Sequence, residues 1–246
     1  MRKLIATVVG SLMIGVAVLA GSQSGGGSLT VDDILANVFK AKGGLDKWHA
    51  VETLKMSGRA TAQGFEVPIT IYSKRPNLTR QEIAVAPGQI SINAFDGSTA
   101  WMVSPMSPTP VVLAGPQAEM TKQQADFDGS LVDYKAKGTA IDLVGTETID
   151  GVKAYHLKVT RKNGLAEHDY IDASTFLQIK GVAEPSSNGI NAKLETQMSN
   201  YKEFGGIMMA TRLRSLSDGV LAVELNIDSI EINLKLDDAF FKLPVK

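Results

Sequence analysis

Residues 65–75 read Phe-Glu-Val-Pro-Ile-Thr-Ile-Tyr-Ser-Lys-Arg, and this stretch alternates apolar with polar side chains. Successive side chains of a β-strand point to opposite faces, so a period of two predicts a strand with one apolar face. We expect that face to point inward, and it is made by Phe65, Val67, Ile69, Ile71, Ser73 and Arg75. Arg75 ends this face, where it either reaches water at the strand edge or turns inward with its donors satisfied.

The same period recurs on both sides of this strand. Further strands are expected at 53–62, 78–86, 89–95 and 99–104, near residue 140, and at 152–161, 166–172, 176–184, 190–201, 207–217 and 220–235. Hairpin turn pairs separate the later strands, namely Asp150-Gly151, Asn163-Gly164, Asn188-Gly189, Gly205-Gly206 and Asp218-Gly219. About eleven antiparallel strands in a meander predict a mainly β protein, curled into a barrel or half-barrel. The lack of crossover helices between strands argues against a parallel α/β sheet.

Helical patterns frame the strands. Thr30 and Asp33 form a capping-box pattern before a helix whose apolar face ends at Gly43-Gly44. A short helical turn is expected at 45–51, anchored by Trp48. A Pro/Ser-rich loop at 105–116 precedes a second helix at 116–126, which is well placed to be a lid or a plug.

The N-terminus has the layout of a cleavable signal peptide, with a basic start, an uncharged apolar run and small residues near Ala20. A retained membrane anchor is the alternative, because the run is close to the roughly 20 residues that span a bilayer. Residues 1–20 are therefore assigned to the signal, 21–28 to a flexible Gly/Ser leader and 29–246 to a single domain. The sequence contains no Cys, so the chain is not itself expected to be a lipoprotein and has no disulfides.

The charge balance points away from nucleic acid. Residues 1–20 contain two of the 25 basic residues and none of the 26 acidic ones, which leaves 23 basic and 26 acidic residues and a net charge of −3. Catalytic patterns are also missing, since the sequence has no Cys, no H-E-x-x-H and no G-x-S-x-G. His49, His156 and His168 share no metal-ligand spacing, and the alternation around His156 predicts that it faces solvent. We expect no cofactor, no metal and no enzyme activity, and we expect a monomer.

Three short motifs resemble one family. Residues 74–78 read Lys-Arg-Pro-Asn-Leu, residues 96–105 carry an Asp-Gly-x-x-x-Trp pattern that ends in Pro, and residues 240–244 read Phe-Phe-Lys-Leu-Pro. In this order and behind a signal peptide, they resemble the lipoprotein-localisation (LolA/LolB-like) superfamily of outer-membrane lipoprotein-sorting proteins. Residues 43–48 and 150–153 are more similar to the broader sorting-like group, whose cargo is mostly unknown.

That resemblance implies an unclosed β-barrel whose helices cover an apolar cavity for acyl chains. It implies that Arg75 holds the lid shut by hydrogen bonds inside the cavity. We expect the cavity and lid to involve Phe65, Val67, Ile69, Ile71, Arg75, Trp101, Met102 and Met120. Methionine adapts to variable apolar shapes, but each of Met56, Met102, Met106, Met120, Met198, Met208 and Met209 could equally fill the core.

The functional expectation is a periplasmic carrier or chaperone that shields a lipid or an acylated lipoprotein on its way toward the outer membrane. Membrane-bound donor or acceptor proteins would be its other partners. The alternative is an envelope sensor of the same fold that binds a protein partner or a mislocalised lipoprotein. A hydrolase that uses the barrel as its pocket is a third hypothesis, which the missing catalytic motifs disfavour.

Overall fold

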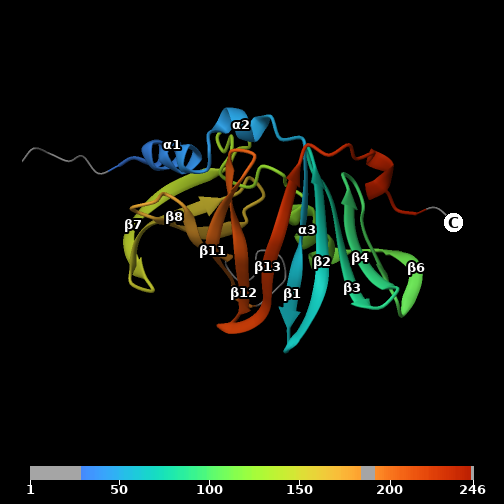
Figure 1. Ribbon diagram of the computed structural model, residues 1–246. Helices are drawn as coiled ribbons and strands as arrows, with labels where there is room; N and C mark the ends of the chain where they lie inside the picture. The colour runs from blue at the N-terminus through green and yellow to red at the C-terminus, as the bar shows by residue number, and fades with distance from the viewer. Residues whose placement is uncertain (1–28, 184–191, 245–246) are drawn as a thin grey trace, which may run out of the picture.

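A computed structural model describes residues 29–183 and 192–244, and the strands of this part form one antiparallel sheet of thirteen (Figure 1). The strands are β1 (Thr53–Ala62), β2 (Phe65–Lys74), β3 (Leu78–Ala86), β4 (Gln89–Asp96), β5 (Ala100–Ser104), β6 (Ser107–Val112), β7 (Ala140–Ile149), β8 (Val152–Thr160), β9 (Ala166–Asp172), β10 (Gln178–Ala183), β11 (Leu194–Phe204), β12 (Ile207–Ser217) and β13 (Val220–Ile232). The predicted signal peptide, the leader and the Asn188-Gly189 turn lie outside the described residues.

The sheet is curved and open, with the order β6-β5-β4-β3-β2-β1-β13-β12-β11-β10-β9-β8-β7. The mainly antiparallel β prediction is confirmed, but the strands do not form one uninterrupted meander. β1 pairs with β13, so the chain must pass from the β6 edge to the opposite β7 edge. Helix α3 (Gly115–Gln124) and residues 125–139 make that passage inside the curve of the sheet, behind β1 and β13 in Figure 1.

The prediction of about eleven strands is wrong because β6 lies in the stretch expected to be a Pro/Ser-rich loop. β6 is an edge strand, which pairs only with β5 within the described sheet. Pro108 and Pro110 cannot donate a ladder hydrogen bond, and an edge strand tolerates this because one of its sides is unpaired.

Helix α1 (Val31–Ala41) forms as predicted, because Thr30 and Asp33 make both hydrogen bonds of the capping box. Its buried residues Ile34, Leu35 and Val38 pack with Leu157, Val159 and Ile171 on the inner face of β8 and β9. Helix α2 (Leu45–His49) follows, and α1 and α2 lie together along the upper end of the sheet in Figure 1.

A close approach fixes the end of α1. Gly43 has φ +107°, and a Cβ at this position would lie 2.0 Å from the carbonyl oxygen of Gly206 in the β11–β12 turn. The backbone N–H of Met208 also donates to the carbonyl of Lys42 at 3.0 Å. Glycine at position 43 therefore seats the α1–α2 corner directly on β12.

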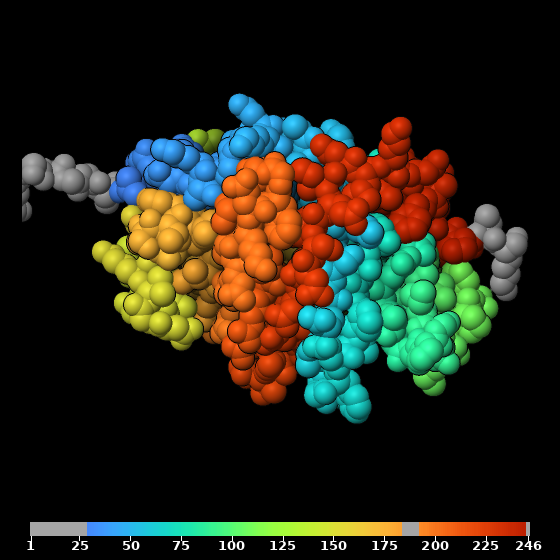
Figure 2. Space-filling model, viewed as in Figure 1, coloured from blue at the N-terminus to red at the C-terminus, as the bar shows by residue number. Residues whose placement is uncertain are grey.

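The C-terminal residues cover the outer face of β2–β5, where they lie against the turquoise and green strands in Figure 2. The short helix η1 (Asp238–Phe241) places Phe240 4.9 Å from the ring of Tyr72. The Trp101 Nε1–H donates to the carbonyl of Phe241 at 2.9 Å. Within the described residues, none of the helices has the length and apolarity to cross a membrane.

The prediction that His156 faces solvent is wrong, since only 7% of this residue is exposed. Its cross-strand neighbour on β9 is Tyr170, and the two rings stack with centroids 4.6 Å apart. Its Nδ1 lies 2.6 Å from Glu147 Oε1 and its Nε2 lies 2.7 Å from His168 Nδ1. Aromatic and ionisable neighbours on β7 and β9 cover the imidazole, and single-strand periodicity does not register such cross-strand neighbours.

Candidate functional site

A cleft of about 610 Å³ lies between the helices and the inner face of β9–β12. Its walls come from α1, α2, α3, β1, residues 128–132 and the strands β9, β10, β11 and β12. The cleft is partly open to solvent, and its volume falls in the range of roughly 300–1,000 Å³ that is typical of small-molecule sites. Helix α3 packs on β4 and β5 inside the curve, and its residues Met120, Gln123 and Gln124 form part of the cleft wall.

Methionine is the most distinctive component of the cleft lining. Five of the seven methionines after residue 28 line it, namely Met56, Met120, Met198, Met208 and Met209. The remaining two lie elsewhere, since Met102 packs on the cluster around Phe95 and Met106 is 97% exposed. Unbranched, polarisable side chains from four elements give this wall the ability to accommodate apolar ligands of different shape.

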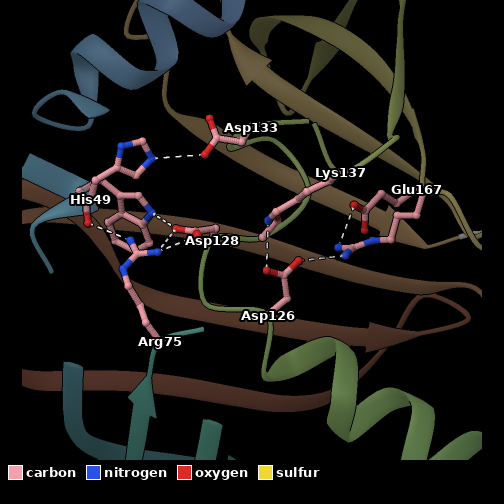
Figure 3. A network of polar contacts seen from close by, with 10 residues as sticks. His49, Arg75, Asp126, Asp128, Asp133, Lys137 and Glu167 are labelled. Atoms are coloured by element: carbon pink, nitrogen blue, oxygen red, sulfur yellow. Dashed lines mark hydrogen bonds and ion pairs between the residues drawn. The ribbon is translucent and has the colours of Figure 1, made fainter. Parts of the chain in front are cut away.

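The Arg75 side chain makes hydrogen bonds to three residues near the C-terminal end of α2 (Figure 3). Its Nη1 donates to both carboxylate oxygens of Asp128, at 2.7 and 2.6 Å. Its Nη2 donates to the carbonyl of Trp48 at 2.9 Å and its Nε to the carbonyl of Val51 at 2.7 Å. Its guanidinium also lies 4.5 Å from the centroid of the Phe127 ring. Arg75 therefore turns inward rather than into water, and joins the end of β2 to α2 and to the cleft wall.

Asp128 completes this network from the cleft wall. Trp48 Nε1–H donates to Asp128 Oδ1 at 2.7 Å, so the carboxylate receives hydrogen bonds from two residues. Burial alone would raise the pKa of Asp128, but the hydrogen bonds from Arg75 and Trp48, together with the charge of Arg75, hold the pKa below its ordinary value. The lowered pKa keeps the Asp128 carboxylate ionised at neutral pH, and its contact connects Arg75 directly to a residue that lines the cleft.

Further polar contacts join residues 125–139 to the sheet and to α2, as Figure 3 shows. Asp126 lies 3.2 Å from Lys137 and 3.4 Å from Arg161, at the end of β8. His49 Nε2 lies 3.5 Å from Asp133 Oδ2, which links the same segment to α2. Residues 128–132 of this segment line the cleft. The segment is also held by apolar packing, since Phe127 lies in the cluster of Val51 and Ile207 and Leu131 packs with α1 and β8.

A buried polar cluster interrupts the apolar lining on the β9–β10 side. Burial, and secondarily the charge of Glu167, raise the pKa of Asp169 to about 7, while Lys42 and Arg161 oppose the shift. Burial lowers the pKa of Lys42, and the charge of Asp169 partly offsets this. Burial also raises the pKa of Tyr201, whose hydroxyl donates to the carbonyl of Gln178 at 2.7 Å. Sequence analysis missed these three residues because they lie far apart in the chain and belong to no motif.

The residues expected on the face of β2 lie on the cleft side of the sheet but do not reach the cleft. Ile71 pairs with Met56, which lines the cleft, and Ile69 is 4% exposed. Phe65 is 76% exposed because it lies at the tip of the β1–β2 hairpin, beyond the helices. Val67 is half-buried and is also outside the lining. The wall of the cleft comes instead from β9–β12, which the sequence did not single out.

The remaining candidates divide between the two faces of the sheet. Met120 on α3 lines the cleft. Met102 packs beside Ala118 of α3, in the cluster of Phe95 and Ala100. Trp101, its neighbour on β5, points to the opposite face and is fully buried under η1. No group of three His, Cys, Asp or Glu within residues 29–183 and 192–244 is placed to hold a metal ion.

The open, curved antiparallel sheet with helices inside its curve is a fold that solved structures share. A LolA superfamily protein from Nitrosomonas europaea superposes with a TM-score of 0.58 at 17% identity, covering 87% of this chain and 98% of its own. A DUF1329 family protein from Desulfovibrio piger gives 0.60 at 14% identity, with 86% and 97% covered.

A third structure supports the same fold. A domain from Vibrio parahaemolyticus, proposed to be an outer membrane lipoprotein-sorting protein, gives a TM-score of 0.60 at 11% identity, with 85% of this chain and 94% of that chain covered. No protein-family model matches the sequence, and no curated protein matches it significantly. The chain has the LolA-like fold, and its particular function must be argued from the cleft.

Proposed function

We propose that this chain is a periplasmic carrier that binds the acyl part of a lipid or lipoprotein in the methionine-lined cleft. The observation that carries the proposal is the cleft itself, about 610 Å³ in volume and lined by five methionines. The neighbours of the same fold support it, since two are described as LolA superfamily and lipoprotein-sorting proteins. We propose binding and transport rather than catalysis.

The energetics of an acyl ligand fit such a cleft. Each methylene removed from water contributes roughly 0.8 kcal/mol, so a chain of a dozen methylenes would gain on the order of 10 kcal/mol before ordering costs. Burial of hydrocarbon needs no cofactor and no directional contact. The cleft can therefore accept chains that differ in length and shape.

In this proposal Arg75 controls access to the cleft. Its four side-chain hydrogen bonds join α2, the end of β2 and Asp128 in the cleft wall. Entry or exit of a long chain requires α2 or residues 125–139 to move away from β9–β12. The Arg75–Asp128 contact adds to the apolar packing of Phe127 and Leu131 in holding this segment, so its loss would ease the movement and speed ligand exchange.

The rest of the proposal concerns location and partners. Residues 1–20 would direct export and residues 29–246 would act as one diffusible domain between the two membranes. The carrier would receive its cargo from one membrane-bound partner and deliver it to another. The three hypotheses of carrier, sensor and hydrolase differ in what the purified domain binds or converts.

The test is ligand binding by purified residues 29–246. Bound lipid is extracted with organic solvent and identified by mass spectrometry, and uptake of a fluorescent dodecanoyl probe is titrated. A variant that fills the cleft, Ala210→Trp, should lose probe binding, because Ala210 lines it. The matched control is Val220→Trp, which adds the same side chain at an exposed hairpin tip and should bind normally.

Three outcomes would contradict the carrier. Absence of both extracted lipid and probe uptake would remove its basis. Equal probe binding by both tryptophan variants would place the ligand outside the cleft. Recovery of one specific membrane protein by a domain that binds neither lipid nor probe would favour the sensor alternative.

A further inference from the structure

The apolar cleft contains a polar end that the transport of hydrocarbon alone does not explain. Lys42 at the end of α1, Asp169 on β9 and Gln178 on β10 all line it, beside the methionine wall. Gln178 Nε2 donates to Asp169 Oδ1 at 2.7 Å. A carboxyl group and an ammonium group in an apolar cleft are costly to bury unless something offsets the lost hydration.

Lys42 has no fixed partner within the described residues. Its ammonium makes no hydrogen bond or ion pair there, and Asp169 influences it only through space. The backbone holds it in place, since Met208 N–H donates to its carbonyl and Gly43 packs on Gly206. The fold therefore places the Lys42 ammonium group in the cleft, where its N–H donors are available to a ligand.

Asp169 is also incompletely satisfied. The described residues provide one hydrogen bond to Oδ1 and none to Oδ2. Gly181 on β10 stands directly across from Asp169 and lines the cleft without a side chain, and a Cβ there would lie 3.4 Å from Oδ1. The missing side chain leaves space beside the carboxyl group that a ligand atom can occupy.

Gln123 of α3 adds a second unused donor. Its Nε2 is buried and has no hydrogen-bond partner in the described structure, and the residue lines the same cleft. Buried amide groups are nearly always hydrogen-bonded, so an unpartnered one at a cleft indicates a missing acceptor. The Lys42 ammonium and the Gln123 amide are both donors that lack a hydrogen-bond acceptor, and only the ammonium carries a charge.

We propose that the cleft binds an amphiphile with an acidic headgroup, whose carboxylate or phosphate oxygens accept from Lys42 and whose hydrocarbon lies against the methionines. This inference rests on the proposed function and narrows it from acyl chains in general to acidic amphiphiles. Asp169 in its protonated form would donate its remaining O–H to a second headgroup oxygen. A cationic headgroup would be repelled by Lys42, and an uncharged one would leave the ammonium unpaired.

The test compares four ligands with the same twelve-carbon chain, laurate, dodecyl phosphate, methyl laurate and dodecylamine, by displacement of the fluorescent probe. Wild type should bind laurate or dodecyl phosphate about ten-fold or more tightly than methyl laurate, as expected for a charge-assisted contact. The better of the two acids identifies the headgroup. Dodecylamine should bind most weakly.

Variants assign the effect to the ammonium. Lys42→Met should bring the affinities for the acids to within about three-fold of the affinity for the ester. Lys42→Arg should restore the preference. Lys40→Met is the matched control, because Lys40 lies exposed on the same helix, and it should keep the full preference. Thermal melting of each variant checks that it is folded.

Each failure has a distinct meaning. Equal binding of acid and ester by wild type, or an unchanged preference in Lys42→Met, overturns the acidic headgroup while leaving the carrier intact. Tighter binding of dodecylamine than of laurate also overturns it, since Asp169 would then act as a carboxylate. Failure of all four ligands to bind contradicts the proposed function itself.

Discussion

Replacement of Asp169 by Asn should make the protein more stable at neutral pH and leave its stability at low pH unchanged. Burial raises the pKa of this carboxyl group from 3.8 to about 7 in the folded protein. The acid groups and bases that face it in the cleft are Glu167, Lys42 and Arg161. Asn has the same shape and its carbonyl can still accept from Gln178, so the substitution removes the titration and little else.

The sign follows from proton binding. Between pH 4 and 7 the unfolded chain has lost the Asp169 proton and the folded chain has kept it, so folded protein binds more protons and stability falls as pH rises. A shift from 3.8 to about 7 corresponds to about 4 kcal/mol as an upper limit. Asp169→Asn should therefore match wild type near pH 3.5 and exceed it by up to about 4 kcal/mol at pH 8.

Urea unfolding at half-unit steps from pH 3.5 to 8, followed by circular dichroism, measures this difference directly. The matched control is Asp142→Asn, which changes an exposed aspartate on β7. Its difference from wild type should stay within about 0.5 kcal/mol at every pH.

Two results would refute the reasoning. A constant difference between Asp169→Asn and wild type across the pH range would show that the carboxyl group is not held protonated by burial. If Asp169→Asn were less stable than wild type at pH 8, the Asp169 carboxylate would have to be stabilised in the folded state, mainly by the charge of Lys42.

Three further predictions concern stability and exchange. Arg75→Lys should lower the free energy of unfolding by about 2 kcal/mol and speed probe release in stopped-flow fluorescence, because an ammonium cannot reproduce the guanidinium fork. Gly43→Ala should lower the free energy of unfolding, measured in urea, by more than about 2 kcal/mol, since the new Cβ would collide with the carbonyl oxygen of Gly206. Gly44 has a similar φ of +101°, but no atom lies near its Cβ position, so Gly44→Ala should lower the free energy of unfolding by less. Trp101→Phe should lower the free energy of unfolding by about 1–3 kcal/mol in the same assay, because the Phe241 carbonyl of η1 loses its donor. It should leave probe affinity unchanged. Equal losses of stability in the two glycine variants, or loss of probe binding in Trp101→Phe, would contradict these assignments.

Much of the fold was predictable because it depends on local patterns. The capping box of Thr30 and Asp33 and the turn at Asp218-Gly219 both form as predicted. The period of two located the strands, but it placed a loop where β6 forms, because prolines at an edge strand lose no pairing on the open side. The strand pattern also gave no sign that the chain passes from one edge of the sheet to the other between β6 and β7.

The candidate site was predictable only where a motif marked it. The resemblance of residues 74–78 singled out Arg75, and the structure places its guanidinium in hydrogen bonds to α2 and Asp128. Asp128 itself follows α3 in a stretch without a motif. Phe65 shared the apolar period of β2 but lies at a hairpin tip, where periodicity cannot distinguish a buried position from an exposed one.

The sequence by itself determined most of the strands, where the first helix begins, and that Arg75 ends an apolar face. These follow from side-chain alternation, caps and turn residues, which act between neighbours in the chain. Only the tertiary structure decided that β1 pairs with β13, that α3 packs on one side of the sheet, and that Lys42, Gln123 and Asp169 line one cleft. Those contacts join residues that are far apart in the chain, and long-range pairing across an open sheet leaves no periodic trace in the sequence.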